Sequence, residues 1–211
     1  MKGAIFDMDG TLLDSMGAWD RVVPLFLKKH GVADPGDINI AIAAMTFVDG
    51  AQYTVDRFSL PMTAADVMKG LNDLMLWEYT HTVQLKPGVR DYLEKLREEG
   101  VALCVATATD RALALPALER QGILDLFQFV VSVEEVGVGK ERPEIFLECA
   151  RRLALPAEEC CVYEDALHSI QAARGAGFAT CGVADGGSAA VDAGEIERLS
   201  TFYITSFEEL L

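Results

Sequence analysis

Two aspartates, Asp7 and Asp9, follow a short apolar stretch at the start of this chain of 211 residues. Residues 4–6 read Ala-Ile-Phe, which predicts a strand, and the chain continues as Asp-Met-Asp-Gly-Thr. Side chains alternate along a strand, but where the chain begins to turn both carboxylates can reach one pocket. Two carboxylates there repel each other unless a cation lies with them, which predicts a hard divalent metal, Mg2+. An aspartate can also act as a nucleophile that carries a phosphoryl group.

The motif Asp7-Met-Asp9-Gly10-Thr11 after an N-terminal strand resembles the first motif of the haloacid dehalogenase-like hydrolase superfamily, in its phosphotransferase branch. The dehalogenases of that superfamily keep the first aspartate and lack the second, so Asp9 argues against dehalogenation. The simpler alternative is a pair of acids in a solvated turn, and the continuation as Gly-Thr directly after a strand favours the catalytic interpretation.

Composition and charge limit the function. A hydrophobic fraction of 51% supports a well-filled core, and no apolar run approaches the ~18 residues of a membrane span. A formal charge of −15 argues against nucleic-acid binding, because it repels phosphate backbones. A phosphorylated substrate would then be attracted locally, by a lysine, a metal and helix N-termini.

The five cysteines form no C-x-x-C pair and no zinc-like spacing. Buried free thiols in a reducing compartment are the simplest interpretation. Together with the absence of a signal peptide in the sequence, they predict a cytoplasmic protein.

Apolar strands and helices alternate after residue 86, which predicts a parallel α/β sheet. The strands are expected at 101–106, 129–132, 160–163, 179–183 and 202–204, and the helices at 87–100, 110–121, 143–153 and 165–176. Such sheets bind ligands at the carboxyl ends of their strands.

Residues 15–85 differ, with helices expected at 18–29, 38–58 and 64–82 and no convincing strand. This insert resembles the small α-helical cap of the superfamily's first class. The resemblance therefore implies a Rossmann-like core of residues 1–14 and 86–211 and an α-helical cap of residues 15–85.

Thr107 and Ala108 follow the strand at 101–106. A hydroxyl and backbone N–H groups here can bind a phosphate oxygen, although Thr107 and Thr109 could also form only a turn and a helix cap. The position resembles the superfamily's second motif, with Thr107 as its hydroxyl residue.

Lys140 follows the glycines of Gly-Val-Gly, and a lysine here can neutralise a nucleophilic aspartate and a transferring phosphoryl group. The superfamily commonly has a lysine followed by P-x-P-[DE]-x-F, whereas this chain has Glu141-Arg142 before Pro143. We prefer Lys140 to Arg142 because it lies at the matching distance from Pro143.

Glu164 and Asp165 end the strand at 160–163 and precede a helix, which resembles the superfamily's acidic signature. The resemblance implies that Asp165 binds Mg2+ directly, with Asp7 and Asp9, and that Glu164 acts through water or pairs with Lys140. Ala166 and Ser169 replace the usual hydroxyl residue and glycine.

The resemblance implies a phosphatase that acts on a small phosphorylated metabolite. Asp7 would form an aspartyl-phosphate, Asp9 would act as acid and then base, and Thr107 and Lys140 would neutralise phosphoryl oxygens. Two alternatives stay open: a sugar-phosphate mutase like β-phosphoglucomutase, and a non-catalytic phosphate-binding protein. The sequence indicates neither the substrate nor the oligomeric state.

Overall fold

The computed structural model of this protein describes residues 1–42, 45–186 and 192–211, and these fall into two compact units. One unit contains residues 1–16 and 83–211, and the other contains residues 17–82. The sequence placed the divisions after residues 14 and 85, close to where the chain passes between the units.

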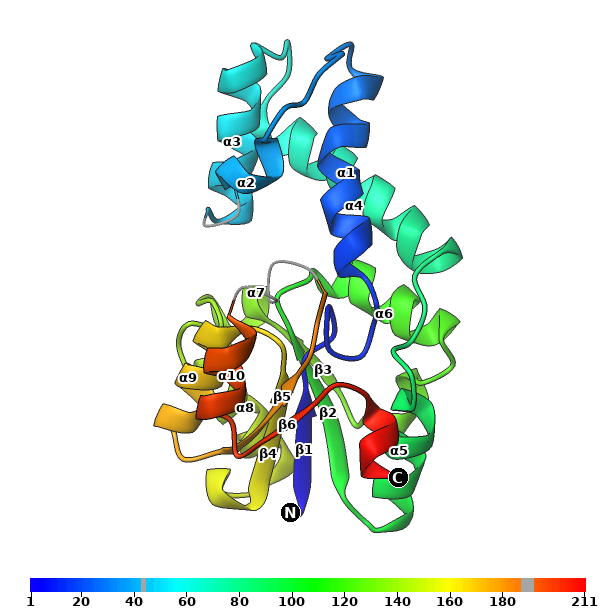
Figure 1. The fold of residues 1–211 in the computed structure, drawn as a ribbon, viewed down its shortest axis with the longest axis vertical. Helices are drawn as coiled ribbons and strands as arrows, with labels where there is room; N and C mark the ends of the chain where they lie inside the picture. Colours follow the sequence, from blue (N-terminus) through cyan, green and yellow to red (C-terminus); the bar gives the residue numbers. More distant parts are fainter. Residues whose placement is uncertain (43–44, 187–191) are drawn as a thin grey trace. The chain divides into compact units, whose positions relative to one another are not determined.

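The larger unit is built on a six-stranded sheet with the strand order β3-β2-β1-β4-β5-β6 (Figure 1). Every pairing between neighbouring strands is parallel. The strands are β1 (Gly3–Phe6), β2 (Ala102–Thr107), β3 (Val130–Ser132), β4 (Cys160–Glu164), β5 (Ala179–Val183) and β6 (Phe202–Ile204). The predicted Rossmann-like α/β core is therefore confirmed.

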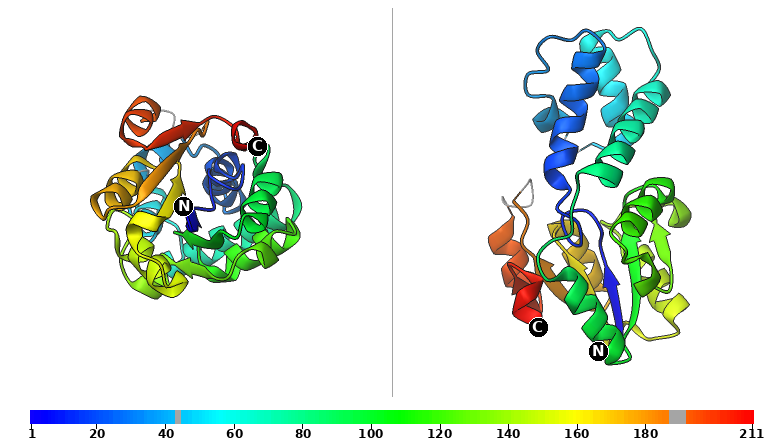
Figure 2. Two further views of the ribbon diagram at one scale, coloured as in Figure 1. Left: turned by 90° about the horizontal axis from the view of Figure 1, so that it is seen from below. Right: turned by 90° about the vertical axis from the view of Figure 1, so that its right-hand side faces the viewer.

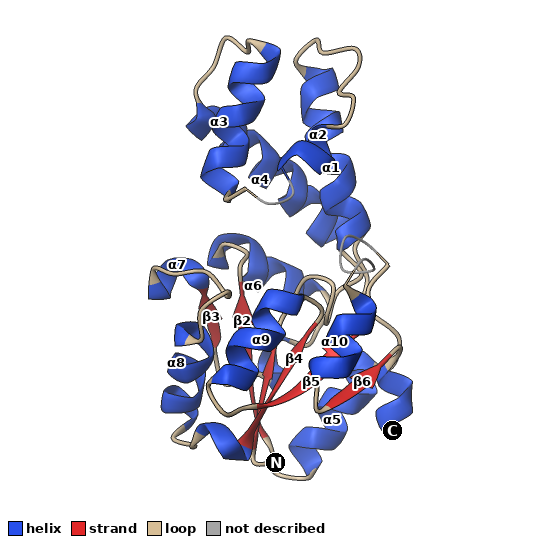
Figure 3. Cartoon of the chain, turned by 60° about the vertical axis from the view of Figure 1, so that its left-hand side comes forward, coloured by secondary structure: helices blue, strands red, loops and turns tan. Residues whose placement is uncertain are grey.

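Helices cover both faces of this sheet (Figures 1 and 3). One face carries α5 (Val89–Glu98) and α6 (Arg111–Arg120), and the other carries α8 (Glu144–Leu153), α9 (Leu167–Gly175) and α10 (Ala193–Leu199). The short segments are α7 (Val133–Val136), η1 (Leu124–Leu126), η2 (Ala157–Glu159) and η4 (Phe207–Leu210). Phe146 of α8, Ile5 of β1 and Val162 of β4 are fully buried and belong to one apolar cluster. Because both faces are covered, the central strands are mostly apolar and buried on both sides of the sheet.

The direction of chain winding reverses beside β1, because β2 and β3 lie on one side of it and β4 to β6 on the other. Such a reversal leaves a crevice at the carboxyl ends of the strands. Phe6, the last residue of β1, is in register with Val105 and Tyr163 on the two neighbouring strands. The residues that follow these strands are thereby brought to one edge of the sheet.

The smaller unit consists of helices in the part of residues 17–82 that the structure describes (Figure 2). They are α1 (Met16–Lys29), α2 (Ile38–Ile42), α3 (Phe47–Phe58) and α4 (Ala64–His81). On α4 the apolar residues Val67, Leu71 and Met75 are buried, and Leu74 is half-buried. Thr63 and Asp66 form a capping box that begins this helix.

The prediction of one helix over residues 38–58 is wrong. The extended residue Thr46 begins α3, and its hydroxyl accepts a hydrogen bond from the backbone N–H of Asp49 at 3.1 Å. Such a cap starts a new helix, so α2 and α3 are separate elements. Residues 43–44, inside the predicted helix, lie outside the described residues. Across the residues described, no helix has the length and apolar character needed to cross a membrane.

Candidate active site

Asp7 lies directly after β1, at the carboxyl end of the sheet, and is only 5% exposed. Its backbone N–H donates to the carbonyl of Tyr163 at 2.9 Å, so the β1–β4 ladder fixes its position. The Lys140 ammonium donates to its Oδ1 atom. Its Oδ2 atom is buried and has no hydrogen-bond partner among the described residues.

Lys140 is 6% exposed and approaches this edge from the loop between α7 and α8. Besides Asp7, its Nζ atom donates to Oε1 of Glu164 at 2.7 Å. Burial alone would lower the pKa of Lys140, but the two carboxylates raise it above its ordinary value. Burial acts to raise the pKa of Glu164, yet the Lys140 charge outweighs it and the pKa is lowered. Lys140 is therefore charged at neutral pH.

Asp7, Glu164 and Asp165 form a buried acidic cluster in the described part of the chain, with one oxygen of each within 4.8 Å of the others. Burial is the main cause that raises the pKa of Asp7 to about 7, against the opposing charge of Lys140. Burial and then the Glu164 charge raise the pKa of Asp165 to about 9. With the carboxylates ionised, these three acids and one lysine carry a net charge of −2. A divalent cation would balance that charge, and the oxygen donor set together with the bare Oδ2 of Asp7 suits Mg2+.

Asp9 is half-buried, and its carboxylate is not part of this cluster. Ser15 donates to its Oδ1 atom at 2.6 Å, and Thr109 donates to its Oδ2 atom at 2.7 Å. The two hydroxyl groups hold the Asp9 side chain beside the acidic cluster rather than in it. These contacts suit a proton-transfer group, and they give no support to the carboxylate of Asp9 as a metal ligand.

Thr107 ends β2 and is 1% exposed. Its hydroxyl oxygen accepts the backbone N–H of Thr109 at 3.0 Å. Ala108 is exposed, and Asp110 caps α6 by accepting the N–H of Ala112 at 2.7 Å. The turn that follows β2 therefore holds a hydroxyl and backbone N–H groups at the same edge of the sheet as Asp7.

Gly10 and Thr11 complete the turn after β1. Gly10 has φ +81°, and a Cβ atom on it would lie 2.3 Å from Oδ2 of Asp165. Only glycine satisfies both conditions. The buried Thr11 hydroxyl donates to Oδ1 of Asp165 at 3.3 Å, which orients that carboxylate.

Four of the predicted residues, Asp7, Lys140, Glu164 and Asp165, thus meet at one place. The sequence did not predict the contacts of Thr11 and Ser15, and it gave Thr109 only as a turn and cap residue. All three are hydroxyl residues within a few positions of an aspartate motif or a strand end, a signal too common to single them out.

The family model for haloacid dehalogenase-like hydrolases matches residues 1–177. The chain belongs to the haloacid dehalogenase-like hydrolases. This confirms the resemblance stated from the sequence. The match includes every residue of the site described above, from Asp7 to Asp165.

Individual relatives within this family are phosphatases by name. The chain is 26% identical over 178 residues to a phosphorylated carbohydrates phosphatase of Thermotoga maritima, across 84% of this chain and 82% of the relative. It is 28% identical over 183 residues to a fructose-1-phosphate phosphatase of Escherichia coli strain K12, across 83% and 93%. A crystal structure from Thermotoga maritima, provisionally named a β-phosphoglucomutase, superimposes with a TM-score of 0.81 at 26% identity, over 100% of this chain and 97% of that one.

This chain departs from the family's usual lysine motif, because Glu141 and Arg142 stand between Lys140 and Pro143. Lys140 nevertheless reaches Asp7 and Glu164. The turn is closed by the N–H of Arg142, which donates to the carbonyl of Gly139 at 3.2 Å. The Arg142 side chain is 61% exposed and pairs with Glu144. Lys140, and not Arg142, therefore reaches the acidic cluster.

Proposed function

We propose that this chain is a Mg2+-dependent phosphatase that hydrolyses a small-molecule phosphate monoester through a phosphorylated Asp7. The observation that carries the proposal is the buried Asp7 carboxylate, which contacts Lys140 and lies beside Glu164 and Asp165 at the switch point of the sheet. The phosphatase names of the relatives support the reaction class.

In the proposed first step an oxygen of Asp7 forms a bond to phosphorus while the bond from phosphorus to the substrate's ester oxygen breaks. Asp9 donates a proton to that leaving oxygen, so the product departs as a neutral alcohol. Asp9 then removes a proton from a water molecule that attacks the same phosphorus atom. The bond to Asp7 breaks, and inorganic phosphate leaves.

Lys140, Thr107 and Ala108 would bind the phosphoryl oxygens during both steps. Lys140 supplies a fixed positive charge, Thr107 a hydroxyl donor and Ala108 a backbone N–H group. These groups are positioned before the substrate arrives, which limits the reorganisation needed in the transition state.

Asp7 and Asp165 would hold Mg2+, with Glu164 acting through water or through its ion pair with Lys140. A bound Mg2+ would neutralise negative charge on the phosphoryl oxygens. The family resemblance assigns the third protein ligand to the backbone carbonyl of Asp9, which leaves the Asp9 carboxylate for proton transfer.

The test is a panel of phosphate monoesters with free phosphate as the readout, which would include sugar phosphates, polyol phosphates, nucleotides and phosphoglycolate. We expect release of phosphate in the presence of Mg2+ from at least one ester and from a generic aryl phosphate. No release from any ester by a folded, Mg2+-supplied protein would favour the non-catalytic alternative.

The mutase remains the second candidate because the Thermotoga maritima structure carries that provisional name. A mutase must hold a bisphosphate intermediate, which requires cationic side chains that are available to a second phosphate. In the helical unit, Arg21 pairs with Glu78 at 3.3 Å, and Lys69 pairs with Asp73 at 2.7 Å. Arg57 pairs with Asp37 at 2.5 Å.

Three of the five Lys and Arg side chains of residues 15–85 are therefore engaged in ion pairs, which supports hydrolysis over the mutase reaction. Supplying β-glucose 1-phosphate with a trace of the bisphosphate separates the two reactions. Rapid formation of glucose 6-phosphate with little free phosphate would establish the mutase.

The remaining proposals concern the helical unit and the cell. We propose, on the family resemblance, that the helical insert predicted at residues 15–85, which includes the compact unit of residues 17–82, is a cap that excludes water from the reaction. The cysteines of the described residues are free and buried, which supports a reducing compartment such as the cytoplasm. The net charge of −15 supports a small phosphorylated metabolite, rather than a nucleic acid, as the partner.

A further inference from the structure

Lys140 depends on a loop with little structure of its own. The α7 helix ends at Gly137, which has φ +78° and donates its N–H to the carbonyl of Val133 at 2.8 Å. Residues 137–140 read Gly-Val-Gly-Lys, so two positions of the loop have no side chain with which to pack. The backbone position of Lys140 therefore depends on the turn closed by Arg142 and on how the two flanking helices, α7 and α8, are held.

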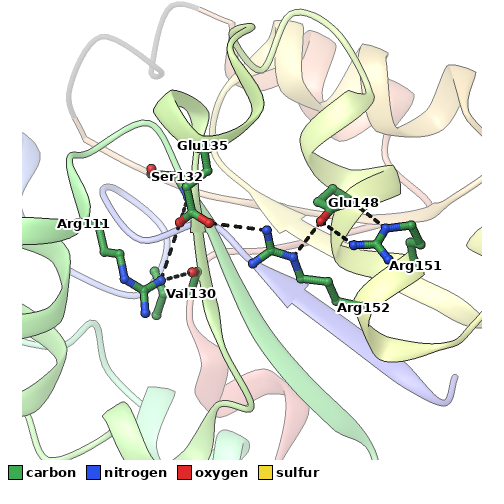
Figure 4. Close-up of polar contacts among 7 residues, drawn as sticks. All are labelled: Arg111, Val130, Ser132, Glu135, Glu148, Arg151 and Arg152. Atoms are coloured by element: carbon green, nitrogen blue, oxygen red, sulfur yellow. Dashed lines mark hydrogen bonds and ion pairs between the residues drawn. The ribbon is translucent and has the colours of Figure 1, made fainter.

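An ion pair joins those two helices. Oε2 of Glu135, on α7, accepts a hydrogen bond at 3.3 Å from Arg152, in the last turn of α8 (Figure 4). A groove of about 490 Å³ lies between the helices, lined by Glu135, Val136 and residues of α8. Val133 and Val136 pack α7 onto the core, and across the groove the Glu135–Arg152 pair joins α7 to the last turn of α8.

The same Glu135 carboxylate also contacts α6, the helix that follows Thr107 in the chain. Its Oε1 atom lies 3.5 Å from the guanidinium of Arg111, the first residue of α6. Arg111 in turn donates to the carbonyl of Val130 in β3 at 2.5 Å. The backbone N–H of Ser132 donates to Oε1 of Glu135 at 3.4 Å. One carboxylate thus contacts groups from α6, β3 and α8 (Figure 4).

We infer that Glu135 is a positioning residue for Lys140: it fixes α7 against α8 and α6 and so sets the distance from the lysine to Asp7. The inference rests on the proposed function, in which Lys140 binds the transferring phosphoryl group. The Glu135 side chain is 32% exposed, and partly exposed ion pairs contribute little to folding stability. A displacement of a charged group in an active site by about 1 Å, in contrast, can lower the rate about a hundredfold.

The test compares Glu135→Gln with Glu148→Gln. Glutamine at 135 keeps an oxygen for the Ser132 N–H but loses the charge. Glu148 is the matched control, because it is 24% exposed and pairs with Arg151 and Arg152 inside α8 only. Glu135→Ala is the second variant, and a melting temperature establishes that each protein is folded.

Hydrogen exchange of the peptide that spans residues 136–142 is the first readout. We expect exchange several-fold faster than in the wild type for Glu135→Gln and unchanged for Glu148→Gln. The second readout is hydrolysis of an aryl phosphate with saturating Mg2+. We expect kcat about tenfold lower for Glu135→Gln with KM within about twofold, and both constants within about twofold for the control.

A double variant separates positioning from a general structural effect. In the Lys140→Ala background, Glu135→Gln should change the residual kcat by less than about twofold, because its effect passes through the lysine. Exchange and kcat that match the Glu148→Gln control would overturn the inference. Wild-type protein without any hydrolysis would instead refute the proposed function, and the exchange comparison would still test the link between Glu135 and the loop.

Discussion

Asp7 is the residue on which the proposed chemistry depends most directly. Replacing it with asparagine keeps the size of the side chain but removes the attacking oxygen anion, so we expect kcat to fall by about a thousandfold or more. Burial raises the pKa of Asp7 to about 7, so ionising it is unfavourable in the metal-free protein. The variant should therefore remain folded, with an unchanged or higher melting temperature in a chelator. A folded Asp7→Asn protein with near-normal kcat would refute the covalent mechanism.

Thr109 acts one step away from the reaction, through the hydrogen bond from its hydroxyl to Asp9 at 2.7 Å. Valine has a similar shape without the hydroxyl, and general acid–base catalysis contributes about a hundredfold or more when its geometry is kept. We expect Thr109→Val to lower kcat about tenfold and Thr109→Ser to restore most of it, as measured with an aryl phosphate. Equal kcat values for the valine and serine variants would show that this hydrogen bond has no role.

The side chains that the sequence could and could not predict differ in how they are specified. Asp7, Lys140 and Asp165 follow strands or glycines in a fixed chain order, and chain order places them at one sheet edge. The contacts of Thr109 and Thr11 depend on side-chain direction in turns that meet only in the folded chain. No spacing in the sequence encodes such a contact.

At the scale of elements, the turn after β1 leaves no room for a side chain at Gly10. Alanine at Gly10 would meet the Asp165 carboxylate at 2.3 Å in addition to adopting φ +81°. Gly31 has φ +86° and no atom within 4 Å of an added Cβ, so Gly31→Ala is the matched control. We expect Gly31→Ala to cost about 1–2 kcal/mol in the free energy of unfolding without a change in kcat.

Gly10→Ala should cost more than this control and should also abolish stabilisation by Mg2+, because Asp165 must move. Urea unfolding with and without Mg2+ provides the comparison. If the two alanine variants behaved alike, the clash with Asp165 would be unimportant.

The elements that sequence analysis missed share a physical cause. The strands were predicted because short runs of apolar residues specify them, as in β4. The long helices were predicted because their apolar residues recur at helical spacing, as in α8. The division between α2 and α3 depends on the cap at Thr46, and α7 is a four-residue turn with too few apolar positions for a helical period. Ser132 and Glu135 do have the spacing of a capping box, which is the signal that could have indicated α7.

At the scale of the whole molecule, the core contains thiols whose ionisation opposes folding. Burial is the main cause that raises the pKa of Cys161 from 9.0 to about 12. As the pH rises above 9, this thiol ionises in the unfolded chain before it ionises in the folded one. Its contribution to the stability of the folded state is therefore fully present below pH 9 and is lost as the pH rises toward 12. We expect the free energy of unfolding to fall by on the order of 1 kcal/mol for this thiol between pH 8 and pH 10. Urea unfolding measures it, and Cys161→Ala, with no thiol to ionise there, should show a smaller fall.

Binding of Mg2+ should couple the site to the stability of the entire larger unit. The acidic cluster draws its carboxylates from the ends of β1 and β4, which are adjacent in the sheet, so the ion binds only when the sheet has formed. Mg2+ at about a hundred times its Kd should then raise the free energy of unfolding by about 2.7 kcal/mol.

Exhaustive chelation should abolish hydrolysis and remove this stabilisation, and Asp165→Asn should weaken both effects. The Glu148→Gln variant, which changes only ion pairs within α8, should respond to Mg2+ as the wild type does. Full activity after chelation, or a melting temperature that does not respond to Mg2+, would contradict a metal site formed by Asp7 and Asp165.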